Sequence, residues 1–317
     1  MSMRAFAIDE LGAAGSIHDL SIPEPGDGEV LVAVHAAGVN PVDAGYASGA
    51  YREYMEHRLP LVPGIDLAGV VERVGAGVDA FAVGDEVYGV AAKSFVGAGT
   101  FADYVVVSAD SIAPKPESLN FAEAAAVPTA ALTALSAIDA ANPGPGQTIA
   151  VLGATGGVGS FLTQLASARG ATVVAISAKS GNALARDLGA AETIDYESSD
   201  VGAELKSRYP VGVDALISTY GDLDAVIAAA RAVRPSGMVL SPALRADAAT
   251  PAFEQLGLTF ASTNRLPPSR LPELSALFDG GQLRVPPITS FPLEQTGSAL
   301  AEIAGGHVRG KLVIAVR

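Results

Sequence analysis

Residues 148–170, TIAVLGATGGVGSFLTQLASARG, decide the fold of this chain. Thr148 to Leu152 is a short apolar run that is typical of a buried strand, and from Val158 the apolar residues recur at helical spacing. The glycines between strand and helix permit a tight turn and let backbone N–H groups approach a ligand closely. The start of the helix offers unpaired amides and a partial positive charge, which suit a pyrophosphate. The stretch therefore predicts a nucleotide-binding strand–turn–helix unit.

Length, composition, net charge and cysteine count limit the classes of protein to which the chain can belong. The chain has 317 residues, of which 49% are hydrophobic and 17% charged, so it can form one large domain or two ordinary domains. A net charge of −14 argues against nucleic acid or an anionic membrane as the main partner. Without any cysteine, a disulfide, a thiol nucleophile and a cysteine-ligated zinc are excluded.

The sequence contains no obvious targeting or membrane segment. The first ten residues, MSMRAFAIDE, lack the apolar core of a signal peptide. The longest apolar stretch, residues 124–138, is interrupted by Pro128 and by hydroxyl side chains, so we expect no membrane span. The expected location is the cytoplasm.

The first 120 residues are predicted to form mostly strands in a barrel-like unit. The expected strands cover Met3–Ile8, Glu29–Ala36, Leu67–Val74, Asp85–Val90 and Phe101–Val107. An Ala-rich helical stretch follows from Phe121 to Ala141, with its expected cap within Ser118-Leu119-Asn120 and an interruption at Pro128.

Strands and helices then alternate along the chain. After Thr148–Leu152, strands are predicted over 172–178, 192–196, 213–219, 237–241 and 258–262, and helices over 182–188, 200–208 and 223–233. Six strands with crossover helices predict a doubly wound parallel sheet, which makes the chain an α/β protein. The tail, with a helix over 271–278 and a strand over 311–316, is expected to fold back on the N-terminal unit. The nucleotide domain, residues 122–264, is then inserted into a unit made of residues 1–121 and 265–317.

The residues after the second strand of this sheet predict the coenzyme. An acidic residue about twenty positions beyond the glycines usually binds the ribose 2′-OH of NAD. Here Ser177 and Lys179 stand in that region without a carboxylate, and Tyr196 ends the third strand. A hydroxyl and a positive charge suit a 2′-phosphate, so the sequence predicts NADP(H). The alternative is a solvated loop lysine beside an ordinary tyrosine.

No metal or serine-nucleophile motif is present. The four histidines, His18, His35, His57 and His307, are scattered without metal-ligand spacing, and no G-x-S-x-G occurs. The stretch GGHVRGK at residues 305–311 is followed by Leu312, where a phosphate-binding P-loop needs Ser or Thr.

Several longer segments resemble a known family, the medium-chain dehydrogenase/reductases, and within it the zinc-free quinone oxidoreductase and enoyl reductase branch. The segments are GVNPVDAGYASGAY (38–51), VPGIDLAGVVERVGAGVDAFAVGDEVYG (62–89), GTFADYVVV (99–107), GATGGVGSFLTQ (153–164) and GGHVRGKLVIAV (305–316). The resemblance covers essentially the whole chain. It implies a Rossmann sheet inserted into a mainly β, GroES-like barrel domain.

The resemblance also implies that zinc is absent. The zinc alcohol dehydrogenases of this family carry Cys where Asn40 stands and a His-Glu pair where Ile65 and Asp66 stand. The cysteine cluster of their structural zinc is missing as well.

The implied reaction is hydride transfer from NADPH to a quinone or to the activated C=C bond of an enone or enoyl substrate. Tyr51 matches a tyrosine near the substrate carbonyl in enoyl reductases and is the candidate proton donor, although the same tyrosine occurs in quinone reductases without a demonstrated role. Asn40 matches a position beside the nicotinamide. The charged segment 52–58 is expected to form part of the substrate mouth. The expected coenzyme contacts are Asn40, Thr129, Gly153, Thr155, Gly156, Gly157, Val158, Ser177, Lys179, Tyr196, Thr219, Pro242, Ala243, Asn264, Arg309 and Lys311.

Two further expectations follow from the resemblance. A relative can bind NADPH with little or no catalysis, as the lens crystallins recruited from this family do, so a binding protein is the alternative function. The last strand of the inserted sheet, residues 257–262, would leave an exposed edge, and such edges pair across a two-fold axis in this family. A homodimer is therefore expected.

Overall fold

The computed structural model describes residues 1–220 and 222–317. The chain divides into two compact units. Unit 1 comprises Met1–Leu132 and Pro267–Arg317, and unit 2 comprises Thr133–Leu266. The first boundary lies eleven residues beyond the expected one because the continuous helix α3 (Pro128–Ala141) runs through it.

Unit 1 is built mainly from strands. Its larger sheet has the order β16-β17-β3-β5-β6-β9, with β8 also paired to β3, and two small sheets pair β1 with β2 and β4 with β7. The strands are β1 (Ser2–Ala7), β2 (Ser16–Ser21), β3 (Glu29–Val39), β4 (Glu56–Val62), β5 (Asp66–Val74), β6 (Glu86–Val90), β7 (Phe95–Ala98), β8 (Tyr104–Ser108), β9 (Ile112–Pro114), β16 (Ile288–Pro292) and β17 (Lys311–Ala315).

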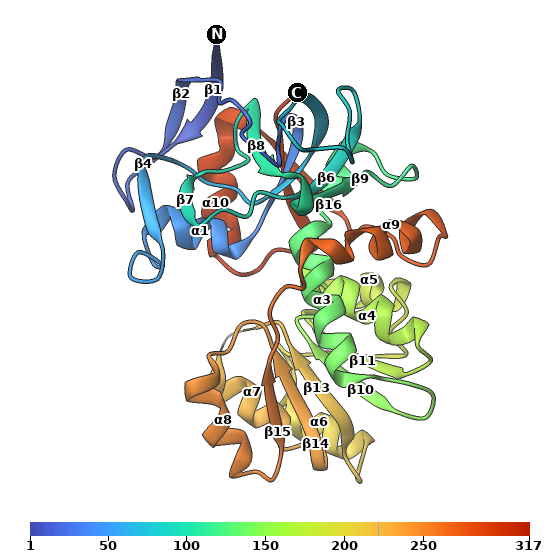
Figure 1. Cartoon of the computed structure of the whole chain (residues 1–317). Coiled ribbons are helices and arrows are strands. Elements are labelled where there is room, and N and C mark those ends of the chain that lie inside the picture. The colour runs from blue at the N-terminus through green and yellow to red at the C-terminus, as the bar shows by residue number, and fades with distance from the viewer. Residues whose placement is uncertain (221) are drawn as a thin grey trace. The chain divides into compact units, whose positions relative to one another are not determined.

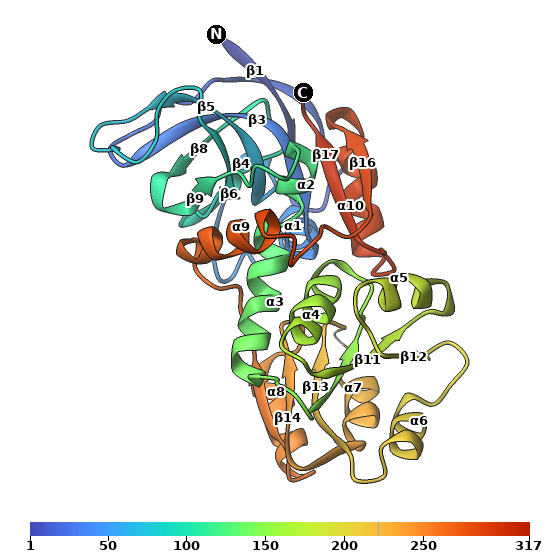
Figure 2. The ribbon, with the colours of Figure 1, turned by 90° about the vertical axis from the view of Figure 1, so that its right-hand side faces the viewer.

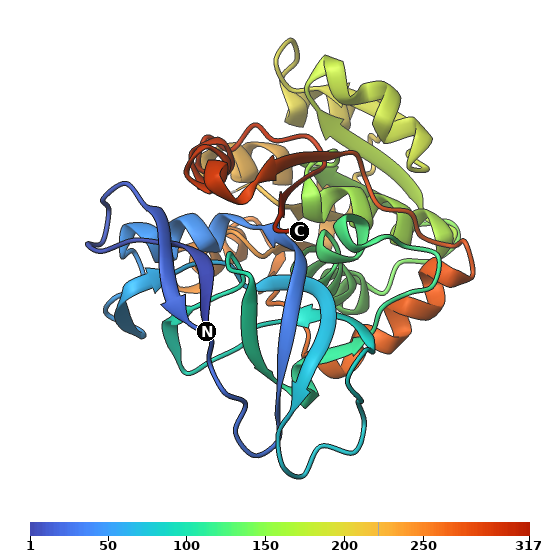
Figure 3. The same ribbon diagram turned by 90° about the horizontal axis from the view of Figure 1, so that it is seen from above.

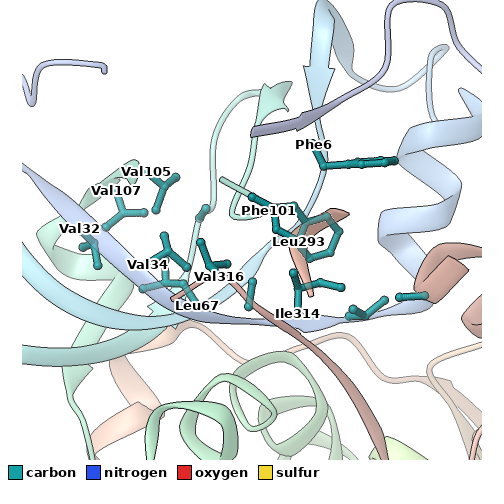
Figure 4. Packing of buried hydrophobic residues seen from close by; sticks show 14 of the residues in the cluster. Phe6, Val32, Val34, Leu67, Phe101, Val105, Val107, Leu293, Ile314 and Val316 are labelled. Carbon is teal, nitrogen blue, oxygen red and sulfur yellow. The ribbon is translucent and has the colours of Figure 1, made fainter. Parts of the chain in front are cut away.

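One apolar core joins these sheets. Figure 4 shows part of it, with Phe6 of β1, Val34 of β3 and Val105 of β8 together with Phe101 and Leu293. Nearly all the strands of unit 1 contribute buried aliphatic or aromatic side chains to this cluster. Strands that surround one core are the architecture expected for a barrel-like domain.

The C-terminal segment completes unit 1. β17 pairs antiparallel with the end of β3 and parallel with β16. Figure 2 shows β16 and β17 beside α10 (Thr296–Ala304), and Figure 3 shows the red C-terminal strand meeting the blue N-terminal strands. The expected return of the tail to the N-terminal unit is therefore confirmed.

Three more helices belong wholly to unit 1. α1 (Pro41–Ser48) begins directly after β3, α2 (Phe121–Ala125) is capped by Asn120, and α9 (Leu271–Asp279) lies in the tail. The Asn120 side chain accepts from the N–H of Glu123 at 3.0 Å, so the cap lies within the stretch that the sequence predicts.

Unit 2 contains one six-stranded sheet in which every neighbouring pair is parallel. Its order is β12-β11-β10-β13-β14-β15, which is the doubly wound order 3-2-1-4-5-6. The strands are β10 (Thr148–Leu152), β11 (Thr172–Ser177), β12 (Glu192–Asp195), β13 (Val213–Ser218), β14 (Val233–Ser241) and β15 (Thr259–Ser262). The predicted parallel sheet is confirmed.

Helices cover both faces of this sheet, which explains why its central strands are apolar on both sides. Figure 1 shows α7 (Leu223–Ala230) and α8 (Ala246–Glu254) on one side and α4 (Gly157–Ala168) on the other. The remaining helices are α5 (Asn182–Asp187) and α6 (Val201–Arg208).

Some sequence predictions of local structure are wrong. The helix expected over 223–233 ends at Ala230, and β14 already begins at Val233. The strand expected from Phe101 begins only at Tyr104. The sequence predictions include no helix between residues 241 and 258, where α8 forms and buries Ala249 and Phe253. Within residues 1–220 and 222–317, no helix combines the length and apolar character needed to cross a bilayer.

Candidate functional site

The carboxyl-end edge of the sheet in unit 2 gathers most of the predicted coenzyme contacts. Because all six strands are parallel, the residues that follow them meet at one edge. At or just beyond the strand ends, in chain order, stand Gly153, Ser177 with Lys179, Tyr196, Thr219, Pro242 with Ala243, and Asn264. We call this set the polar edge of unit 2.

The glycine turn at this edge is a close-packed cradle. Gly153 has φ +82°, a left-handed conformation that favours glycine, and a Cβ there would meet the hydroxyl of Thr219. A Cβ on Gly159 would overlap the carbonyl of Gly153. α4 begins at Gly157, and its N-cap, Gly156, provides no side-chain cap. The first turn, including Val158, is thus left without a capping side chain, which fits an anionic pyrophosphate.

Three residues link the turn to the end of β11. A Cβ on Gly181 would lie 2.9 Å from Thr155 Oγ1 and 3.2 Å from Ser177 Oγ. Thr155 and Ser177 are both buried. The Ser177 hydroxyl lies 3.3 Å from the Ala178 carbonyl and 3.3 Å from Asn182 Oδ1, so it is held at the strand end.

The surroundings of Lys179 include a carboxylate that the sequence reasoning missed. Lys179 is exposed, and its backbone N–H and its charge both help to lower the pKa of Asp195. The largest cause of that lowered pKa is the Ser198 hydroxyl, which donates to Asp195 at 2.7 Å. The sequence does place Asp195 at the end of the predicted third strand, and in the structure it pairs with Ser177 at the end of the neighbouring parallel strand. Tyr196 is 43% exposed, and burial raises the pKa of its hydroxyl.

The other members of the polar edge have ordinary local roles. The Thr219 hydroxyl donates to the Leu152 carbonyl at 3.1 Å. The Ser241 hydroxyl accepts from the N–H of Ala243 at 3.1 Å and so turns the chain after Pro242. Asn264 is exposed. These groups, with the glycine cradle, fit a dinucleotide along the edge.

Unit 1 contains a second group of polar residues, which we call the buried polar cluster: the buried Asn40, Asp43, Asp66 and Lys311 and the partly buried Thr129. Sheet topology brings three of them together. β5 and β17 both run antiparallel to β3, so their first residues, Asp66 and Lys311, lie beside the end of β3, where Asn40 follows. Asn40 is the N-cap of α1, and Thr129 lies in the first turn of α3.

Hydrogen bonds connect the members of this cluster. Lys311 Nζ donates to Asn40 Oδ1 at 2.7 Å and to the Val39 carbonyl at 3.0 Å. Asn40 Nδ2 donates to Asp66 Oδ2 at 2.9 Å. The Thr129 hydroxyl donates to Asp66 Oδ1 at 2.6 Å, and the Thr129 N–H donates to the same carboxylate.

Asp43 is the second buried carboxylate of the cluster. Its Oδ2 accepts from the N–H of Asn40 at 2.7 Å, while its Oδ1 is buried and without a hydrogen-bond partner. Burial raises the pKa of Asp43 to about 8, so this carboxyl is mostly protonated at neutral pH. Burial also raises the pKa of Asp66, which Lys311 opposes, and lowers the pKa of Lys311, which the two carboxylates oppose.

The donor set of this cluster does not fit a catalytic zinc. At the positions where the resemblance places zinc ligands stand an amide, an aliphatic side chain and Asp66, and the ammonium of Lys311 already donates to Asn40. Across residues 1–220 and 222–317, no three His, Cys, Asp or Glu side chains are grouped so as to hold a metal ion.

Tyr51 lies on the surface of unit 1 against α1. Its ring occupies the space where a Cβ on Gly45 would stand, and it meets the ring of Tyr46 edge-on at 5.4 Å between centroids. Tyr51 is 39% exposed. In the following charged segment, Arg58 lies over the Phe95 ring at 3.7 Å and bonds Glu56 at 2.9 Å.

The predicted C-terminal contacts, Arg309 and Lys311, have different environments. Arg309 is exposed, whereas Lys311 is only 4% exposed and directs its ammonium into the buried polar cluster. The structure thus joins Asn40, Thr129 and Lys311 in unit 1. The contacts from Gly153 to Asn264 lie in unit 2.

Comparison with known proteins agrees with this architecture. Residues 26–117 match the alcohol dehydrogenase GroES-like domain, and residues 188–314 match the zinc-binding dehydrogenase family. The NADPH-dependent alkenal/one oxidoreductase of Arabidopsis thaliana chloroplasts is 32% identical over 98% of this chain and 79% of its own length. The chain belongs to the medium-chain dehydrogenase/reductases.

Other family members have similar sequences or folds. The chloroplast quinone-oxidoreductase QR1 of Triphysaria versicolor is 32% identical over 98% of both chains. The solved structure of the quinone oxidoreductase from Coxiella burnetii superimposes with a TM-score of 0.90 at 30% identity, covering 100% of both chains. Within the family, these relatives belong to the quinone oxidoreductase and enoyl reductase branch, which agrees with the resemblance noted in the sequence.

Proposed function

We propose that this protein is an NADPH-dependent oxidoreductase that reduces a quinone or the activated C=C bond of an α,β-unsaturated carbonyl compound. The observation that carries the proposal is the polar edge of unit 2, where the glycine cradle, Ser177 and Lys179 lie at the ends of adjacent parallel strands. Relatives named for NADPH-dependent alkenal/one reduction and for quinone reduction support the substrate class.

In this proposal the polar edge holds the adenosine and pyrophosphate parts of the coenzyme. The first turn of α4 binds the pyrophosphate through backbone N–H groups. Ser177, Lys179 and Tyr196 bind the 2′-phosphate. The chemistry that the coenzyme supplies when bound is hydride donation, and the chain supplies binding and orientation.

In the same proposal, residues of unit 1 bind the nicotinamide and the substrate. Asn40 and Thr129 contact the nicotinamide. Tyr51 donates a hydrogen bond from its hydroxyl to the substrate carbonyl oxygen, on which negative charge develops during reduction. The partial exposure of Tyr51 and the position of its ring on Gly45 support this role.

The reaction is proposed to be independent of zinc. Without a Lewis acid, the developing charge on the carbonyl oxygen must be stabilised by hydrogen-bond donors or water. The protein dialysed against a strong chelator should therefore keep its full rate, and added zinc should not raise it.

The test is the loss of reduced-nicotinamide absorbance with NADPH and NADH separately, using a quinone and an enone as acceptors. Consumption of NADPH with either acceptor supports the proposal. If NADPH binds but no acceptor is reduced across a broad panel, the alternative of a coenzyme-binding protein without catalysis is favoured. Equal use of NADH would contradict the 2′-phosphate pocket.

Tyr51→Phe tests the proton donor. The variant should lower kcat about 100-fold or more and leave the affinity for NADPH unchanged. Tyr104→Phe removes the phenol hydroxyl of a tyrosine on β8, outside segment 52–58, and should keep the full rate. A Tyr51→Phe enzyme with wild-type kcat would contradict the role of Tyr51.

A homodimer belongs to the same proposal. β15 is an edge strand of the sheet and pairs with β14 on one side. A second copy of the chain could pair with its other side. Light scattering should give twice the chain mass, and a monomer mass would contradict the dimer. The cytoplasmic location stays a prediction, which imaging of the tagged chain in cells can check.

A further inference from the structure

The carboxamide of Asn40 has one chemically allowed orientation. Its oxygen accepts from Lys311 Nζ at 2.7 Å, and its nitrogen donates to Asp66 Oδ2 at 2.9 Å. Turned over, the NH₂ group would face the ammonium and the carbonyl oxygen would face the carboxylate. The two neighbours therefore determine which atom points each way.

Asp66 also determines the hydrogen-bonding role of Thr129. The Thr129 hydroxyl donates its proton to Asp66 Oδ1 at 2.6 Å, and the Thr129 N–H points at the same carboxylate. With the proton engaged, the hydroxyl oxygen acts as an acceptor toward a ligand. An acceptor suits an N–H donor such as the carboxamide of nicotinamide.

Burial makes this arrangement costly. Asp66 is 0% exposed and Lys311 is 4% exposed, so water solvates neither charge well. The Lys311 ammonium reaches Asp66 only through the amide of Asn40, although the two charges influence each other's pKa. Buried opposite charges are often no more stabilising than apolar side chains of the same volume. A structural role alone therefore accounts poorly for an amide held between two buried ionisable groups.

We propose that Asp66 and Lys311 are positioning residues for coenzyme binding. They fix the orientation of Asn40, and Asp66 fixes Thr129 as an acceptor, so that the nicotinamide meets one arrangement of polar atoms. This inference rests on the proposed function, which assigns Asn40 and Thr129 to the nicotinamide. It gives Lys311 an indirect role in place of the direct coenzyme contact predicted from the sequence.

The test compares single variants with a double variant. Lys311→Met or Asp66→Asn alone leaves a buried partner uncompensated and lowers the unfolding temperature. The double variant, Lys311→Met with Asp66→Asn, removes both charges and recovers most of that temperature. It also lets Asn40 turn over, because an amide at position 66 can donate to the Asn40 oxygen.

Coenzyme affinity separates positioning from stability. Titration of the double variant should show NADPH binding about tenfold or more weaker than in the wild type, as expected for loss of a charge-assisted hydrogen-bond arrangement. Binding of adenosine 2′,5′-bisphosphate, which lacks the nicotinamide, should stay within about twofold. Lys115→Met is the matched control: Lys115 is another largely buried lysine of unit 1, donating to the Leu119 carbonyl, and its loss should lower stability without changing NADPH affinity.

Thr129 gives a second test that leaves both charged side chains, Asp66 and Lys311, in place. Thr129→Val removes the acceptor and should weaken NADPH binding about tenfold, whereas Thr129→Ser should restore it. Wild-type NADPH affinity in the double variant or in Thr129→Val overturns the inference alone. A wild-type protein that does not bind NADPH contradicts the proposed function as well.

Discussion

The polar edge of unit 2 and the buried polar cluster of unit 1 are built in opposite ways. The polar edge uses backbone groups and strand ends, and several of its side chains, including Lys179 and Tyr196, are exposed. The cluster uses ionisable side chains that are almost fully buried and joined across up to 271 residues of sequence. A site built from backbone groups needs glycines, because a Cβ would keep the ligand from the N–H groups. A site built from buried polar side chains needs each hydrogen-bond and charge partner, because an unpaired buried group is costly.

The largest expected effect is on the free energy of unfolding when a lysine is replaced in each region. Lys311→Met should lower the free energy of unfolding by about 3–5 kcal/mol, because it leaves Asp66 buried without its cation. Lys179→Met, in the exposed site, should change it by less than about 0.5 kcal/mol. Urea unfolding of the two variants measures the contrast, and equal stabilities would remove the distinction.

A smaller loss of stability is expected when a side chain is added in the glycine cradle. Gly159→Ala places a Cβ against the carbonyl of Gly153 and should cost about 1–3 kcal/mol of stability, with weaker NADPH binding. In an ordinary helix the same change would stabilise. Gly144→Ala is the matched control in unit 2, since its nearest neighbour would be Gln147 Oε1 at 3.9 Å. NADPH affinity unchanged in Gly159→Ala would argue against the cradle.

The pH dependence of stability tests the burial of Asp43. Because burial raises the pKa of Asp43 to about 8, the folded protein keeps a proton that the unfolded chain releases. The free energy of unfolding should therefore fall by up to about 1.4 kcal/mol per pH unit between about pH 5 and pH 8, and level off above. Asp43→Asn mimics the protonated carboxyl and should flatten this slope. Urea midpoints across that range measure it, and identical slopes would show that Asp43 does not titrate there.

The smallest effect concerns the carboxylate beside Lys179. Asp195→Asn removes a negative charge near the proposed 2′-phosphate pocket and should tighten NADPH binding by roughly two- to fivefold at low salt. NADH binding should not change. Glu254→Gln makes the same change in net charge at the end of α8, which precedes β15 and so lies toward the opposite edge of the sheet. An equal gain in both variants would mean that net charge alone acts.

Most of unit 2 could be predicted from the sequence because its signals are local. β10 begins and ends where the apolar run of residues 148–152 predicts, and α4 begins one residue before the predicted start. The misses have specific tertiary causes. α8 contains Pro251 and is stabilised by packing, since the Phe253 ring stacks on Phe260 at 5.3 Å between centroids. The short strands β2, β4 and β7 depend on partners elsewhere in the chain and carry no strong pattern of their own.

The candidate site shows the same division. The residues of the polar edge follow predicted strands, so their meeting at one edge could be inferred from strand order. Asp195 directly precedes the predicted Tyr196, but the pattern of a ribose-binding carboxylate applies to the end of the second strand, and Asp195 ends the third. The role of Asp66 was missed because its partners, Asn40 and Thr129, are 26 and 63 residues away.

The sequence by itself determined the family, the parallel sheet and the glycine turn, since these depend on residue order, apolar periodicity and the conformational freedom of glycine. Only the tertiary structure decided that Lys311 points inward and that Asp43 and Asp66 share its surroundings. The physical reason is that burial and charge compensation are set by strands that meet from distant parts of the chain. A lysine at the start of a strand has the same local pattern whether its ammonium meets water or the amide of Asn40.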